Sequence, residues 1–98
     1  MQLLISPLAA QDLEEIGDYI AQDNAARAIS FLAELQTLCQ KITNNPHGYR
    51  KRIELGAELR SCAHGNYVIF FTTDTHTVTI VRILHGSRDI TQTSIQPT

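Results

Sequence analysis

The chain has 98 residues, of which 43% are hydrophobic and 18% are charged, and its formal net charge is −2. This composition excludes an intrinsically disordered chain, and the length predicts one domain over residues 1–98. Residues 1–45 hold six acidic and two basic residues, a net charge of −4, whereas residues 46–98 hold four acidic and six basic residues, a net charge of +2. So small a basic excess does not support an extended nucleic-acid-binding surface, and no direct sequence-specific nucleic-acid binding is expected.

Hydropathy and cysteine usage bear on location. Met1–Ile5 is too short for the apolar core of a signal peptide, and no apolar run approaches the ~20 residues of a membrane-spanning helix. Cys39 and Cys62 lack the spacing of a metal site and are expected to be free thiols, as in a reducing compartment. We therefore expect a cytoplasmic protein that makes no membrane contact.

The first half of the chain predicts one strand and two helices. Gln2–Ile5 is a short apolar run that stops at Ser6–Pro7, a pair suited to the first positions of a helix. Apolar residues then recur at helical spacing through residue 20, and a second, broader stripe lies between residues 28 and 42. Only a few residues separate these helices, so they are expected to form an antiparallel hairpin.

The second half predicts strands. Residues 47–56 indicate a polar, basic loop. Three strands are then expected, over residues 59–63, 67–72 and 77–85. Alternation places Val78, Ile80, Arg82 and Leu84 on one face of the last strand, which is largely apolar on both faces and should lie centrally. Residues 91–98 are polar and are expected to be a loosely ordered tail.

Taken in order, these segments predict an α+β fold with the sequence β-α-α-β-β-β. The first strand joins a C-terminal antiparallel meander, which makes a mostly antiparallel four-stranded sheet. The helical hairpin is expected to cover one face of that sheet, because each helix presents a single apolar stripe that must be buried.

Two strand arginines are the first candidates for chemistry. Arg60 and Arg82 lie on strands that are neighbours in a meander. If both side chains emerge on the same face, they form a cationic site for a phosphate or a carboxylate. The alternative is that each pairs with an acid such as Glu58 or Asp89, or covers the sheet edge.

Two further clusters carry charge. Residues 85–89 place His85, Arg88 and Asp89 close together after a strand. A ribonuclease could use such a histidine as acid or base and the arginine for transition-state charge, although a structural clasp is the favoured interpretation. Arg50–Arg52 is a loop charge run that is either solvated surface or a docking patch beside Arg60.

Metal and cofactor chemistry is not expected. His47, His64, His76 and His85 stand apart from one another and from any close cysteine pair, so no tetrahedral metal site is predicted. The chain also lacks a glycine loop for a phosphate and a glycine-flanked nucleophile on a strand-to-helix turn.

Several segments follow the order and spacing of a known family. They are Ser6–Leu13 with Ile16 and Tyr19–Ile20, Asn45–Pro46, Leu55, Leu59–Ser61, Tyr67–Phe70 and Arg82–Asp89. With these segments the chain resembles the ParE toxins of bacterial type II toxin–antitoxin modules, within the wider RelE/ParE superfamily. The resemblance covers nearly the whole chain and becomes specific through Arg82–Asp89, which closes the series.

The resemblance implies the fold already expected and a protein partner. That partner is a cognate antitoxin whose C-terminal segment folds along the toxin and neutralises it. The apolar breadth of the second helix suits such a partner, so Phe31, Leu35 and Leu38 are the expected antitoxin-binding residues.

Within the superfamily, RelE-like members cut mRNA on the ribosome, commonly with a C-terminal tyrosine or histidine, whereas ParE-like members trap DNA gyrase on cleaved DNA. Here Arg88 stands about where the ribonuclease tyrosine is expected, no tyrosine follows Tyr67, and the overall charge is modest. The resemblance therefore implies a gyrase-directed toxin that causes growth arrest and is not expected to be an enzyme.

Target contacts are then expected from the clusters described above. They are Arg60, Arg82, His85, Arg88, Asp89 and, in the loop, Arg50, Lys51 and Arg52. Two alternatives stay open. One is a ribosome-dependent mRNA endonuclease, in which Arg60 and Arg82 bind phosphates and His85 is the acid or base. The other is an inactive antitoxin-binding module.

Overall fold

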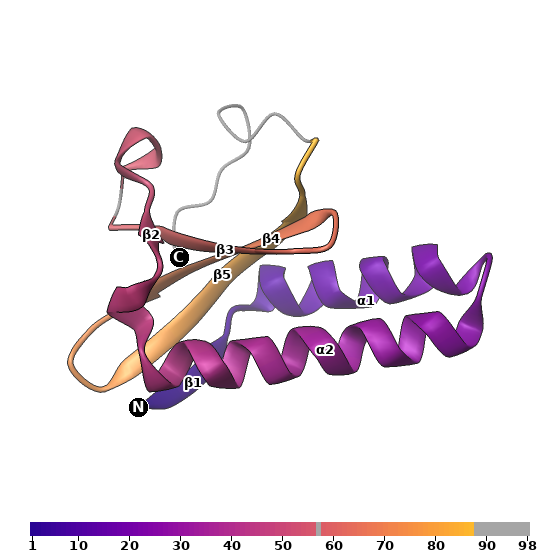
Figure 1. Ribbon diagram of the computed structural model, residues 1–98, viewed down its shortest axis with the longest axis horizontal. Coiled ribbons are helices and arrows are strands. Elements are labelled where there is room, and N and C mark those ends of the chain that lie inside the picture. The colour runs from indigo at the N-terminus through magenta and orange to yellow at the C-terminus, as the bar shows by residue number, and fades with distance from the viewer. Residues whose placement is uncertain (57, 88–98) are drawn as a thin grey trace.

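Two helices run side by side against one five-stranded sheet (Figure 1). The computed structural model describes residues 1–56 and 58–87. The elements are β1 (Gln2–Ile5), α1 (Pro7–Ala21), α2 (Ala25–Asn44), β2 (Arg50–Lys51), β3 (Arg60–His64), β4 (Tyr67–Thr73) and β5 (Thr77–His85). The predicted helical hairpin and the α+β class are confirmed. The expected tail, residues 91–98, lies outside the described residues.

The sheet has the strand order β1-β5-β4-β3-β2, with β1 parallel to β5 and the other neighbours antiparallel. The expectation of four strands is therefore wrong by one. The fifth, β2, lies in the segment expected to be a loop and pairs Arg50 with Ser61 and Lys51 with Arg60. Two residues are too few for an alternating pattern, so this strand exists only because the open edge of β3 offers it a partner.

Both helices begin at the side-chain caps that the sequence supplies. Ser6 Oγ accepts a hydrogen bond from the Ala9 N–H at 3.0 Å, and Asn24 Oδ1 accepts one from the Arg27 N–H at 3.0 Å. Each cap satisfies one of the amide donors that the first turn of a helix leaves free. Neither helix is long and apolar enough to cross a membrane, a finding that covers the described residues alone.

The core consists of two apolar clusters on opposite faces of the sheet. The helix-side cluster packs strand residues against both helices. It includes Ala9, Ile16, Phe31, Leu35, Cys39, Ile42, Ile69, Phe71, Val78, Ile80 and Ile83. The smaller cluster on the other face, which we call the helix-free face, holds Leu59, Phe70, Val81 and Leu84. Phe70 and Phe71 are both fully buried on opposite faces, which explains why β4 is apolar on both sides.

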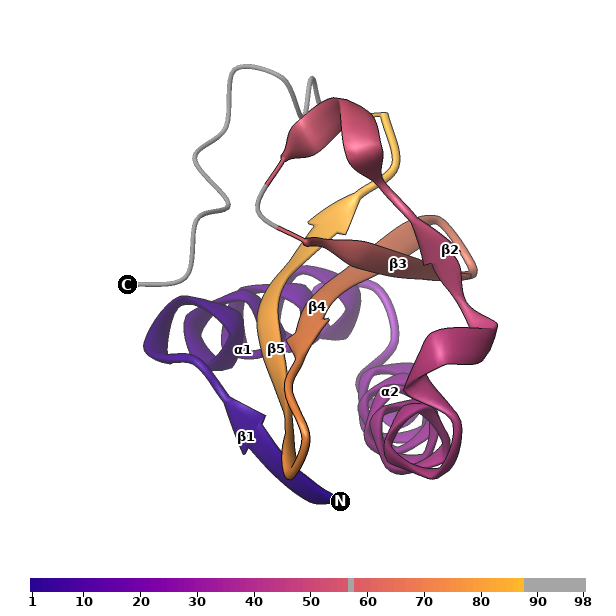
Figure 2. The ribbon, with the colours of Figure 1, turned by 90° about the vertical axis from the view of Figure 1, so that its left-hand side faces the viewer.

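A β-bulge in β5 reverses the alternation of its side chains. Phe71 pairs with Ile80 and Phe70 with Arg82, so Val81 is an extra residue between them. Val78 and Ile80 therefore face the helices, whereas Leu84 faces away from them. The expectation that these residues share one face with Arg82 is wrong, because strict alternation holds only for an uninterrupted strand. Figure 2 shows how strongly β4 and β5 curve past the helices.

Candidate functional site

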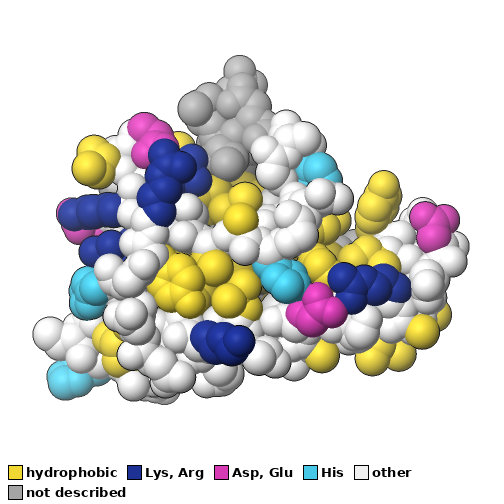
Figure 3. Space-filling model, in the orientation of Figure 1, with side chains coloured by type: hydrophobic (Ala, Val, Ile, Leu, Met, Phe, Trp, Pro, Cys, Tyr) yellow, Lys and Arg dark blue, Asp and Glu magenta, His cyan; other side chains and the backbone are white. Residues whose placement is uncertain are grey.

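The helix-free face carries a cationic group that β2 and the residue after it supply. Arg50 pairs with Ser61, and Ser61 pairs with Phe70, so these side chains share that face. The Arg52 guanidinium donates to Ser61 Oγ at 3.3 Å and lies 5.7 Å from the centre of the Phe70 ring. We call Arg50, Lys51 and Arg52 the basic edge, although Lys51 pairs with Arg60 and so lies on the helix side of the sheet. In Figure 3 dark blue side chains gather over the end of the molecule that holds β2.

Two carboxylates partly neutralise the basic edge. Glu54 Oε2 accepts from Arg52 Nε at 2.9 Å and lies 3.8 Å from Arg50 Nη2, while Lys51 Nζ lies 3.1 Å from Glu58 Oε2. The hydrogen bond from Arg52 lowers the pKa of Glu54 below its ordinary value. The Arg50 side chain is still 74% exposed, so it can exchange Glu54 for an anionic group on a partner.

Arg82 is engaged inside the protein. Its Nε and Nη2 donate to the two carboxylate oxygens of Asp12 at 2.8 and 2.9 Å, and Asp12 Oδ2 also accepts the Ile83 N–H at 2.9 Å. The Arg82 side chain is 13% exposed and that of Asp12 is 5% exposed. The hydrogen bonds that Arg82 donates to Asp12 raise the pKa of Arg82 above its ordinary value. Within the described residues Arg82 therefore pairs with an acid, as the alternative weighed for it supposed, and that acid is Asp12 rather than Glu58.

Arg60 lies on the opposite face from Arg82. It pairs with Phe71, which belongs to the helix-side cluster, whereas Arg82 pairs with Phe70. The Arg60 guanidinium donates to the Tyr49 carbonyl oxygen at 2.9 Å. The condition for a shared phosphate site, two arginines emerging on one face, is therefore not met. The bulge at Val81 decides this, because it turns the second half of β5 over.

His85 stands at the far end of β5 from Arg60 and the basic edge. Its ring meets Tyr67 edge-on at 5.2 Å between centroids, and its Nδ1 accepts the Ser87 N–H at 3.2 Å. Around it lies a small hollow that Glu15 and Tyr19 of α1 also line. His85 is thus set apart from Arg60 and the basic edge, whereas Asp12, the partner of Arg82, lines the same hollow. The predicted contacts Arg88 and Asp89 lie outside the described residues.

The proposed antitoxin residues divide by burial. Leu35 is fully buried and Phe31 is 5% exposed, and both belong to the helix-side cluster. They cannot form a surface in this fold, because the sheet and α1 already cover them. Leu38 is half-buried and lines a hollow that Lys41 and His64 also border. Of the three residues, Leu38 has the most exposed side chain.

Beside Leu38 lies an ionic network that sequence reasoning missed. Glu34 accepts from Arg27 Nη1 at 2.6 Å and meets His64 Nε2 at 2.8 Å. The Arg27 guanidinium also lies 5.0 Å from the centre of the Phe31 ring. These contacts lower the pKa of Glu34, and the hydrogen bond from Arg27 contributes most. Arg27 and Glu34 are seven positions apart on one helix face, a spacing that could have indicated the pair.

Metal ligands and cysteine thiols are the remaining groups that could carry chemistry. Within residues 1–56 and 58–87, no three histidine, cysteine, aspartate or glutamate side chains are grouped to hold a metal ion. Burial raises the pKa of Cys39 to about 11 and also raises the pKa of Cys62. Both cysteines are free, and burial disfavours their reactive thiolate form.

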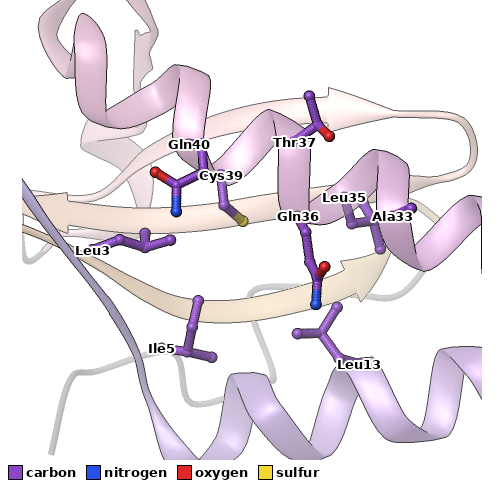
Figure 4. A pocket seen from close by; sticks show the side chains of 9 residues that line it. All are labelled: Leu3, Ile5, Leu13, Ala33, Leu35, Gln36, Thr37, Cys39 and Gln40. Carbon is purple, nitrogen blue, oxygen red and sulfur yellow. The ribbon is translucent and has the colours of Figure 1, made fainter.

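A hollow of about 470 Å³ opens between β1 and the diverging helices (Figure 4). The side chains of Leu3 and Ile5 from β1 and Leu13 from α1 point toward it, opposite residues of α2 that include Leu35 and Cys39. Its lining is mostly apolar, and the titratable group in it is the Cys39 thiol, whose pKa burial raises to about 11. It is suited to apolar contact rather than to catalysis.

Comparison with known proteins gives one family match and one similar solved structure. A family model described as "ParE toxin of type II toxin-antitoxin system, parDE" matches residues 3–90. The chain belongs to the ParE toxin family. A solved structure described as "Chromosomal ParDE TA system from P. aeruginosa" is 18% identical to this ParE-family chain, with a TM-score of 0.73, and the match covers 87% of this chain and 95% of that one. At that identity the likeness shows the fold alone. A search of curated proteins found no match.

Proposed function

We propose that this ParE-family chain is the toxin of a type II toxin–antitoxin module that inhibits DNA gyrase. It binds gyrase without catalysis and stabilises the complex in which DNA is cleaved. The observation that carries this proposal is the family match over residues 3–90. A cognate antitoxin neutralises the toxin, an inference that the relative described as a ParDE toxin–antitoxin system supports.

The positions of the charged groups favour binding over catalysis. Cleavage of RNA needs an acid or base and a cation that converge on one phosphate. Here Arg82 is bonded to Asp12, Arg60 lies on the other face of the sheet, and His85 stands at the far end of β5. This separation supports a non-catalytic toxin, so the mRNA endonuclease becomes an outcome of the test rather than a second proposal.

The basic edge is the surface that we propose for gyrase contact. Arg50 and Lys51 have side chains that are 74% and 43% exposed, and each can leave its intramolecular carboxylate at little cost. Arg52 is less exposed and lies over the Phe70 ring, so it holds the basic edge in place and contributes less to direct contact with gyrase. Arg82, as a partner of Asp12, supports the fold from which these residues project.

A supercoiling and cleavage assay tests the activity. Purified gyrase, plasmid DNA and the folded chain free of antitoxin are incubated with and without ATP. Loss of supercoiling together with accumulated linear DNA is expected. Untouched gyrase would contradict the proposal and would direct attention to cleaved transcripts, or to a module that only binds an antitoxin.

Paired variants test the surface. Replacing both Arg50 and Lys51 with alanine is expected to raise the concentration for half-inhibition about tenfold or more, as lost interfacial charge contacts do. The control is Arg27→Ala, which also removes an exposed cation but at the start of α2, away from β2 in Figure 1. Equal potency of the double variant and the control would place the gyrase contact elsewhere.

Leu38 remains our proposed antitoxin contact. It lies in a hollow between α2 and β3 that Lys41 borders, so an apolar side chain with an acidic neighbour would find both partners there. Phe31 and Leu35 support this surface from behind as part of the core.

A further inference from the structure

The two edges of the sheet differ in how they are protected. The β2 edge is two residues long and carries Arg50 and Lys51, the kind of charge that blocks pairing with another strand. The β1 edge carries no charged side chain, and residues 1–11 contain none. Leu4 is 46% exposed and Leu8 is 44% exposed beside it. In Figure 2 β1 lies at the outer border of the sheet.

The backbone of β1 has hydrogen-bonding groups to offer. Its contacts with β5 include Gln2 N–H to the His76 carbonyl at 2.8 Å and, at the next residue after the strand, Ser6 N–H to the Ile80 carbonyl at 3.0 Å. In a parallel ladder alternate residues face the partner strand, so Leu3 and Ile5 turn their N–H and C=O groups outward. Because Gln2 and Ser6 donate to β5, this alternation puts the Leu3 and Ile5 N–H groups on the side of β1 away from β5.

We propose that this edge pairs with β1 of a second copy of the chain, antiparallel about a two-fold axis at Leu4. The alternation of the outward-facing N–H and C=O groups along β1 fits this arrangement. Leu3 lies opposite Ile5 of the copy and exchanges both backbone hydrogen bonds with it, and Ile5 does the same with Leu3 of the copy. The same backbone groups on both chains thus satisfy each other's hydrogen bonds, as a two-fold interface requires.

The side chains fit the same partner. Leu4 meets Leu4 of the copy on the face away from the helices, in a pair whose Cα atoms lie about 4.5 Å apart. Leu3 and Ile5 lie on the helix side, at the mouth of the apolar hollow. Because the side chains of residues 1–11 are uncharged, two identical edges meet without repulsion between side chains, whereas a charged segment would find no complementary side chain there.

The pairing is expected to be weak and reversible. The strand has four residues, and Pro7 follows it without an N–H to extend the ladder. The dimer is therefore expected to form in the micromolar range or above. This inference concerns the β1 edge alone and does not depend on gyrase being the target.

Sedimentation of the full chain over a concentration series tests the dimer. The wild type is expected to move toward twice its monomer mass as concentration rises, whereas Leu4→Lys, which opposes two lysines at the axis, stays monomeric. The control is Ile29→Lys on α2, where the native side chain is 73% exposed, and it should behave like the wild type. Circular dichroism confirms that all three chains are folded.

Two results would contradict the proposal. The first is a wild type that stays monomeric at hundreds of micromolar. The second is a dimer that persists in Leu4→Lys, because its interface must then lie elsewhere. A monomeric wild type whose antitoxin binding is weakened by Leu4→Lys would assign the edge to the antitoxin instead of a second copy.

A cross-link tests the register. In Leu4→Cys the two thiols at the axis are close enough for a disulfide, and glutathione disulfide as oxidant should convert them to a covalent dimer. The matched control is Ile29→Cys, which is more exposed but away from the axis. The wild type reports any background from Cys39 and Cys62. Dimer yield many-fold above both controls is expected, and equal yields from the two cysteine variants would contradict the register.

Discussion

At the scale of single residues, Asp12 does the most to join distant parts of the chain. Its carboxylate accepts hydrogen bonds from Nε and Nη2 of Arg82, 70 positions away, and from the Ile83 N–H. The carboxylate thus occupies the place that a neighbouring strand would take along this part of β5. Because Asp12 is 5% exposed, losing it leaves a nearly buried guanidinium and an amide without partners.

Asp12→Ala is therefore expected to lower the free energy of unfolding by about 3 kcal/mol or more, as breaking a buried ion pair does. Urea denaturation followed by circular dichroism measures the loss. Glu14→Ala, an exposed carboxylate on the same helix, is the control and should cost less than about 0.5 kcal/mol. A loss under about 1 kcal/mol for Asp12→Ala would show that water replaces the carboxylate easily.

Glu34 makes stability depend on pH. Hydrogen bonds from Arg27 and then His64 hold its pKa below the ordinary value of 4.5. A carboxylate with a lowered pKa in the folded state stabilises the fold above its unfolded pKa, and this contribution disappears as pH falls through the folded pKa.

The stability difference between the wild type and Glu34→Gln is therefore expected to shrink as pH falls from about 5 to about 3. Urea midpoints at several pH values measure it, with constant ionic strength. The Glu14→Gln variant, exposed on α1, controls for general effects of net charge. A difference that stays constant over this range would mean that Glu34 gains nothing from its partners.

At the scale of elements, Ser6 joins α1 to β5. Its Oγ accepts the Ala9 N–H at 3.0 Å and donates to the Val81 carbonyl at 2.8 Å. Val81 is the bulged residue of β5, so the helix cap also satisfies a carbonyl that the bulge turns away from the regular ladder. Asn24, in contrast, only caps α2 in an exposed position.

Ser6→Ala is expected to lower stability by about 2 kcal/mol, from one lost cap and one unsatisfied carbonyl. Asn24→Ala, which removes a cap alone, should cost about 1 kcal/mol. Thermal and urea unfolding of the two variants provide the comparison. Equal losses would indicate that the contact between Ser6 and Val81 contributes little.

At the scale of the whole molecule, the sheet separates two surfaces. The helices cover one face and bury the larger cluster, while Arg50 and Arg52 of the basic edge lie on the other face at β2. The bulge at Val81 decides which strand residues belong to which face, so it separates Arg60 from Arg82. An uncharged edge at β1 and a charged edge at β2 then make the two borders of the sheet chemically different.

The sequence by itself determined the elements and the family. Ser6–Pro7 and Asn24 mark helix starts through local capping, and strand-favouring runs between turn signals mark β3, β4 and β5. These signals lie within a few positions along the chain, so they can be interpreted without knowing the fold. Residues 3–90 carry enough of them to show membership of the ParE family.

Only the tertiary structure decided how the charged residues are combined. The partner of Arg82 is 70 positions away, β2 exists only through its pairing with β3, and one inserted residue in β5 reverses the faces. None of these features leaves a periodic trace in the sequence. Each arises when packing brings distant segments together and a buried charge or an open strand edge must find a partner there.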